Sequence, residues 1–187
     1  SISTLVCSSS LVGMLATMKF SALIALTVGA ALGVAAPAAS APEPYSSVLS
    51  TVIADTSAAA ADVAKLNSQS IETFHTVESD LSNLLQAINN GIAQVEPAAA
   101  ITSNSDALLL ATPVDNLAAA ASSLVDKLQA NMQQIVQANK CHKIYSELES
   151  INDKGKNLVS DIVAKVPSDL TTEAQQLAAP VTNAFAN

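Results

Sequence analysis

The sequence predicts an all-α protein, an antiparallel bundle of about five helices preceded by a cleaved signal peptide. From residue 46 onward, apolar residues recur at steps of three and four, which places them on one face of each helix. Alanine, the best helix former, is abundant, while aromatic residues make up only 3% of the chain and no apolar–polar alternation predicts a strand. Short links between the segments favour antiparallel neighbours.

The leader is the first element. Residues 1–17 are expected to be an upstream extension without a role in the fold. Residues 18–41 read as a secretory signal peptide: Lys19 is followed by the apolar run 20–36 and by the small-residue exit Ala39-Ser40-Ala41. The alternative is one anchor helix over residues 11–36, but the interrupting Lys19 favours cleavage.

Residues 42–187 are then expected to form a single secreted domain. Its seven lysines and sixteen acids give a formal charge of −9, which disfavours binding to a nucleic acid backbone. No arginine is present to clamp a phosphate or carboxylate. Cys141 would be the only cysteine left after cleavage, so we expect no internal disulfide and a small apolar core residue at this position.

The first two helical segments span residues 46–66 and 70–95, and Pro97 ends the second. The stripe of the first comprises Val48, Val52, Ala59, Val63 and Leu66. The stripe of the second comprises Ile71, Phe74, Leu81, Leu85, Ile88, Ile92 and Val95.

The third segment spans residues 105–138, with Ser105 as its expected N-cap. Pro113 lies too deep for the first helical position, so we expect a kink or a new helix start there. The stripe comprises Leu110, Val114, Leu117, Ala121, Leu124, Leu128, Met132 and Ile135.

The last two segments span residues 140–166 and 168–185, separated by Pro167. Pro180 should bend the final helix. The fourth stripe comprises Cys141, Ile144, Leu148, Ile151, Gly155, Leu158 and Ile162, and the fifth comprises Leu170, Ala174, Leu177, Val181 and Phe185.

No grouping of residues predicts catalysis, a cofactor or a metal site. His75 and His142 are the only histidines, and neither has the spacing of a metal-binding motif. Cys141 and His142 are adjacent, so on a helix they point about 100° apart and do not form a nucleophile–base pair by adjacency alone. An enzyme is therefore the least favoured class of function.

Two segments resemble a known family. Residues 103–110 (SNSDALLL), followed by Pro113-Val114 and Leu117, are similar to a segment of the fungal hydrophobic surface-binding protein A family, which includes antigenic cell-wall galactomannoproteins. Residues 161–167 and 177–181 are similar to its closing pattern. The resemblance implies a secreted, wall-associated, five-helix protein without catalytic residues. It also implies adsorption to hydrophobic surfaces, recruitment of secreted hydrolases and, in some members, fatty acids held between helices.

Three functions therefore stay open. The first is binding of a long-chain fatty acid or other lipid, the second is adsorption to a hydrophobic surface, and the third is a structural or antigenic wall component without a specific ligand. We expect a monomer or weak dimer with no transmembrane anchor. For the lipid hypothesis, Tyr145 is expected to donate a hydrogen bond to the carboxylate of the lipid. The side chains expected to form the aliphatic walls are Leu81, Leu85, Ile88, Leu117, Leu124, Leu128, Ile144 and Leu148. The competing interpretation is that these side chains fill a dry core.

Overall fold

The computed structural model describes the main chain of residues 42–67 and 69–185. The predicted leader, residues 1–41, lies outside the described residues. Every regular element in the described part is a helix, which confirms the predicted fold class. The helices are α2 (Tyr45–Val63), α3 (Ile71–Val95), α4 (Asn104–Leu108), α5 (Ala111–Ala130), α6 (Met132–Gln137), α7 (Cys141–Ala164), the short 3-10 turn η1 (Ser168–Leu170) and α8 (Thr171–Phe185).

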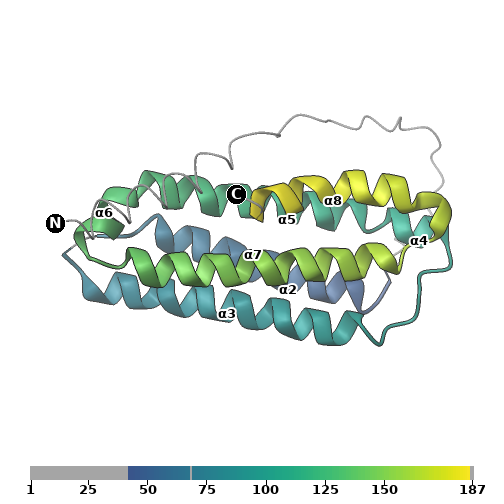
Figure 1. Ribbon diagram of the computed structural model, residues 1–187, viewed down its shortest axis with the longest axis horizontal. Coiled ribbons are helices and arrows are strands. Elements are labelled where there is room, and N and C mark those ends of the chain that lie inside the picture. Colours follow the sequence, from purple (N-terminus) through teal and green to yellow (C-terminus); the bar gives the residue numbers. More distant parts are fainter. Residues whose placement is uncertain (1–41, 68, 186–187) are drawn as a thin grey trace, which may run out of the picture.

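The five longest helices of the described part pack into a closed ring, and they run along the long axis of the bundle (Figure 1). Helix α2 packs against α3 and α5, α3 packs against α7, and α8 lies between α5 and α7. Helix α8 has 15 residues, whereas α3 has 25 and α7 has 24. At ~1.5 Å per residue α8 is therefore roughly 15 Å shorter than these neighbours, so it covers only part of their length. It lies over the end of the bundle that carries α4 (Figure 1).

The predicted stripes form one apolar core. Phe74, Leu81 and Ile88 on α3 are each no more than 1% exposed. Tyr45, which precedes the predicted first segment, is also buried, and its hydroxyl donates to the carbonyl of Ala99 at 2.5 Å. This bond fixes the start of α2 to the loop that follows α3.

The predicted third segment is three helices rather than one. The structure caps α4 with Ser103, whose Oγ accepts from the backbone N–H of Asp106 at 3.3 Å, so the prediction of Ser105 as the N-cap was wrong. The new helix start expected near Pro113 is confirmed, because α5 begins at Ala111. Pro113 is then in the first turn, where a backbone N–H has no partner within the helix, so a proline costs little.

A turn in the left-handed conformation separates α6 from α7. Asn139 has φ 57°, a value that asparagine tolerates better than most residues, and the N–H of Lys140 donates to the carbonyl of Ile135 at 3.1 Å. The ammonium of Lys140 lies 2.9 Å from the Glu78 carboxylate. This ion pair joins the turn to the first part of α3.

Cys141 begins α7 and is buried, as expected of a core position. It is disulfide-bonded, however, which corrects the expectation of an unpaired cysteine. The only other cysteine in the sequence, Cys7, lies outside the described residues.

Residues Asn104–Ala130, which include α4 and α5, are long and apolar enough to cross a membrane by length and composition alone. The same stretch packs against α2 and α8 as a wall of the bundle. A bundle helix passes this test as readily as a membrane span does, so it is weak support for a span.

Candidate functional site: an aliphatic pocket beneath α8

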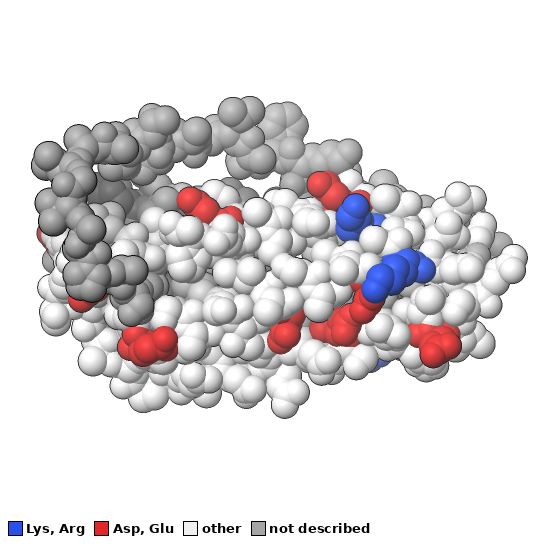
Figure 2. All heavy atoms as spheres, turned by 180° about the vertical axis from the view of Figure 1, so that it is seen from behind, with Lys and Arg blue, Asp and Glu red and all other residues white. Residues whose placement is uncertain are grey.

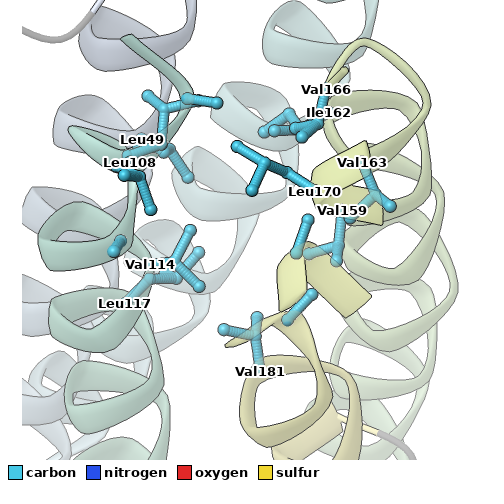
Figure 3. Close-up of a pocket in the computed structure, with 15 residues that line it drawn as sticks. Leu49, Leu108, Val114, Leu117, Val159, Ile162, Val163, Val166, Leu170 and Val181 are labelled. Atoms are coloured by element: carbon cyan, nitrogen blue, oxygen red, sulfur yellow. The ribbon is translucent and has the colours of Figure 1, made fainter. Parts of the chain in front are cut away.

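The main candidate site is a pocket between α5, α7 and α8, at the end of the bundle that carries α4. Figure 3 shows side chains from α2 and α5 facing side chains from α7 and η1, with Val181 of α8 beyond them. All fifteen lining residues are aliphatic: Leu49, Ala107, Leu108, Leu110, Ala111, Val114, Leu117, Val159, Ile162, Val163, Val166, Leu170, Ala174, Ala178 and Val181.

The pocket is a narrow slot that opens to solvent. Its cavity volume is about 60 Å³, and the whole hollow, which includes open solvent at the mouth, is about 620 Å³. Leu108 lines the slot yet is 58% exposed, which places it where the pocket meets solvent. Typical small-molecule pockets measure about 300–1,000 Å³, so a long ligand would have to lie in the mouth as well or push the walls apart.

The walls at this end differ in how firmly they are held. No residue of α4 or η1 is buried. The loop between α3 and α4, by contrast, is fixed by Lys165, whose ammonium donates to the carbonyls of Glu96 and Ala98, each at 2.8 Å. The carbonyl of Lys165 also accepts from the N–H of Ile101 at 2.8 Å. The frame of the pocket is therefore anchored, while the segments at its rim have few buried contacts and can open at lower cost.

The structure brings only one of the nine residues predicted as ligand contacts to this pocket, namely Leu117. Five others lie in the close-packed core and are no more than 2% exposed: Leu81, Ile88, Leu124, Leu128 and Ile144. Leu148 is buried at 8% exposure, and Leu85 and Tyr145 are half-buried against the core. Contact of these eight residues with a ligand stays a prediction.

Sequence reasoning missed most of the α7 wall. Val159 and Val163 on α7, and Val166 just beyond its end, line the pocket at steps of four and three residues. They form a second apolar stripe beside the predicted one that ends at Ile162. Two adjacent stripes on one helix indicate that it faces two neighbours, here α3 and α8. That signal was present in the sequence.

A second groove, with a cavity volume of about 210 Å³, runs between α2 and α5. Its lining is small and partly polar: Ser57, Ala60, Ala61, Ala120, Ser123 and Lys127. The alanines belong to the tetrads at residues 58–61 and 118–121, which allow helices to approach closely. The groove offers neither a deep apolar wall nor a cluster of converging polar groups.

Ionisable side chains do not assemble into a reactive centre in the described part of the chain. His75 is 67% exposed, with its Nδ1 3.7 Å from a carboxylate oxygen of Glu78. No group of three or more His, Cys, Asp or Glu side chains there could hold a metal ion. Because Cys141 is disulfide-bonded, it provides no thiolate for His142 to activate.

One pair of carboxyl groups has perturbed acidity. Asp62 on α2 and Asp80 on α3 interact through their side chains. The hydrogen bond from Lys65 lowers the pKa of Asp62, whereas burial, together with the neighbouring Asp62, raises the pKa of Asp80. This pair lies on the α2–α3 side of the ring, and neither residue lines the pocket.

The surface charge is sparse. Figure 2 shows a mostly uncharged face on which isolated acidic side chains outnumber the lysines. This face fits the net negative charge of the chain, and the described residues visible on it form no basic patch of the kind that binds nucleic acid.

Comparisons with known proteins place this fold. Two solved structures match three quarters of the chain and about nine tenths of their own. Ligand binding domain 1 of the MP1 protein from Penicillium marneffei, complexed with arachidonic acids, has a TM-score of 0.68 at 21% identity, covering 75% of this chain and 90% of that one. AfMP4P in complex with palmitic acid has a TM-score of 0.69 at 16% identity, covering 75% and 91%. At these identities the likeness shows a shared fold.

Comparison of sequences also identifies the family. Cell wall mannoprotein 1 of Aspergillus fumigatus is 33% identical over 169 residues, which is 90% of this chain and 58% of that protein. Cell wall mannoprotein 1 of Aspergillus flavus is 30% identical over 109 residues, or 58% of this chain and 40% of the relative. The matched part of the chain thus spans little more than half the length of the first relative and less than half that of the second. The profile of the hydrophobic surface binding protein A family matches residues 43–164, so the chain belongs to that family.

Proposed function

We propose that this protein is a non-enzymatic lipid-binding protein that holds the hydrocarbon chain of a long-chain fatty acid or similar lipid in the slot beneath α8. The observation that carries the proposal is the lining, fifteen aliphatic side chains from four sides of the bundle. Two proteins of the same fold were solved with arachidonic and palmitic acid, which supports the same class of ligand here.

The energetics allow useful affinity. Burying about fourteen methylene groups at ~0.8 kcal/mol each gives ~11 kcal/mol of gross transfer free energy. Association and ordering cost several kcal/mol, and moving α4 and α8 apart adds to that cost. With ~4 kcal/mol of such costs, a net binding free energy of ~7 kcal/mol corresponds to a Kd of about 10 μM.

The place of action that we propose is the fungal cell wall. The relatives at 33% and 30% identity are named cell wall mannoproteins, and they are longer than this chain. Secretion, wall association, recruitment of secreted hydrolases and a monomeric state are parts of this proposal.

Adsorption to a hydrophobic surface is the second candidate function. It is favoured by the family to which the chain belongs and by two large apolar side chains in water, Ile71 at 71% exposure and Leu108 at 58%. Leu108 belongs to the pocket rim, so the same end of the molecule could contact a surface and admit a lipid.

A matched pair of substitutions on α8 tests the pocket. Ala174 and Ala179 are both half-buried, but only Ala174 lines the slot. Ala174→Phe should fill space equivalent to about four methylene groups and weaken binding by ~3 kcal/mol, roughly 150-fold. Ala179→Phe should leave Kd within about threefold.

Binding would be measured by displacement of a fluorescent fatty acid, with circular dichroism to check that both variants fold. Native mass spectrometry of secreted protein should show a co-purified lipid. The proposal is wrong if the wild type binds no fluorescent fatty acid, or if the two substitutions weaken binding equally. Depletion onto hydrophobic beads without any lipid binding would favour the adsorption hypothesis instead.

A further inference from the structure

The slot beneath α8 has two different ends. At the α4 end, Leu108 lines the slot and is 58% exposed, so solvent reaches the lining there. At the other end, Leu117 on α5 is 2% exposed and Val181 on α8 is fully buried. Figure 3 shows Val181 at the end of the pocket away from Leu108 and Val166. The slot is therefore open at one end and closed at the other.

Buried neighbours close the far end. Ala121 is the next buried residue after Leu117 along α5, and Leu158 is the next one before Ile162 along α7. Ala121 and Leu158 are each 1% exposed, and neither lines the slot. The lining therefore stops where the close-packed core begins. A hydrocarbon chain that has reached Leu117 and Val181 can go farther only by displacing core side chains, which are packed as densely as an organic crystal.

The slot also has a defined length. Along η1 and α8 the lining residues follow one another at steps of four, four and three residues, from Leu170 through Ala174 and Ala178 to Val181. At ~1.5 Å per residue this track is about 16 Å long. Because the lining is aliphatic throughout, a fatty acid gains most by inserting its methyl end and leaving its carboxylate in water at the open end. The chain then lies along α8 with its terminal methyl group toward Val181.

We propose that Val181 and Leu117 form the end wall of the slot and so set the longest hydrocarbon chain that it buries in full. Each methylene group that enters the slot should tighten binding about fourfold. Once the terminal methyl group reaches Val181, a further methylene group stays in water at the mouth and should change Kd by less than about twofold. This inference rests on the proposed function, because it concerns the same slot and the same class of ligand.

The test measures Kd for a series of saturated fatty acids from octanoate to stearate, each below its micelle concentration. Each acid would displace one fluorescent fatty acid from the secreted protein, expressed from the full chain. We expect the affinity to rise about fourfold per methylene group up to one chain length and then to level off. A steady rise across the whole series would overturn the inference and leave the proposed function intact. Displacement by none of the acids would overturn both.

Matched substitutions test the end wall. Val181→Ala removes two carbon atoms from the end of the slot, so the affinity should level off at chains about two carbons longer. Val181→Ile adds one carbon atom and should shorten that chain length by about one carbon. Val77→Ala is the control, because Val77 is also 0% exposed but lies on α3 and does not line the slot.

The control variant should level off at the wild-type chain length, and circular dichroism would check that all three variants fold. If neither Val181 variant changed the chain length at which the affinity levels off, Val181 would not be the end wall. An equal change in Val77→Ala and Val181→Ala would also overturn the assignment.

Discussion

Leu117→Ala and Leu124→Ala together decide where a ligand lies. Both leucines are on α5, seven residues apart on one face, and both are 2% exposed. Only Leu117 lines the slot, while Leu124 lies in the closed core. Each truncation should therefore cost about 2–5 kcal/mol of folding free energy, because a buried leucine leaves a cavity. In a domain of this size that loss lowers Tm by roughly 5–15 °C.

The two variants should differ in binding. The Leu117→Ala cavity opens into the slot, where two or so methylene groups of a lipid could occupy it. At ~0.8 kcal/mol for each methylene group, Kd should fall by roughly tenfold. The Leu124→Ala cavity has no opening to the slot, so Kd should stay within about threefold.

The assay is displacement of a fluorescent fatty acid, with a second readout from the rise in Tm on adding saturating lipid. That rise measures affinity for the folded state through linkage, so it should be larger for Leu117→Ala than for the wild type. If Leu124→Ala changed Kd as much as Leu117→Ala, the ligand would lie through the centre of the bundle. If Leu117→Ala left Kd unchanged, the slot would not be the binding site.

Three further predictions concern the frame of the bundle. A Cβ on Gly91 would lie 2.6 Å from Cγ1 of Val48, so Gly91→Ala should lower the unfolding free energy by about 1–3 kcal/mol in chemical denaturation. Val48→Ala removes the clashing atom and should rescue most of that loss. If the losses of unfolding free energy from the two substitutions simply added in the double variant, the clash would be contradicted. The pKa of Asp80 is raised, chiefly by burial, so ionisation of Asp80 destabilises the fold. Asp80→Asn should therefore raise Tm at pH 7, and the gain should vanish below pH ~4, where the wild-type carboxyl is protonated in both the folded and the unfolded state. A gain in Tm that did not depend on pH would refute this cause. Lys165→Met should remove two charge-assisted hydrogen bonds and speed amide exchange over residues 96–103, and unchanged exchange there would show that the clamp does not hold the loop.

Local pattern was sufficient for the helices. Steps of three and four between apolar residues placed α2, α3 and α7 to within a few residues, because burying one face of a helix is what makes that helix stable. The break near Pro113 was also predictable, since a proline removes a backbone donor wherever it stands. The N-cap of α4 could not be predicted in the same way, because Ser103 and Ser105 have the same capping chemistry. Which of the two serines caps the helix depends on the path of the preceding loop.

The sequence by itself determined an acidic, all-helical chain with five apolar-faced segments and no reactive grouping. It could not determine where the packed helices leave a pocket, because a leucine that fills a core and a leucine that lines a pocket follow the same helical periodicity. That choice depended on the short α8, which closes the ring at one end and leaves an aliphatic slot beneath it. Packing a 15-residue helix against longer neighbours is a property of the assembled bundle, so only the tertiary structure moved the candidate site from the centre of the core to the end that carries α4.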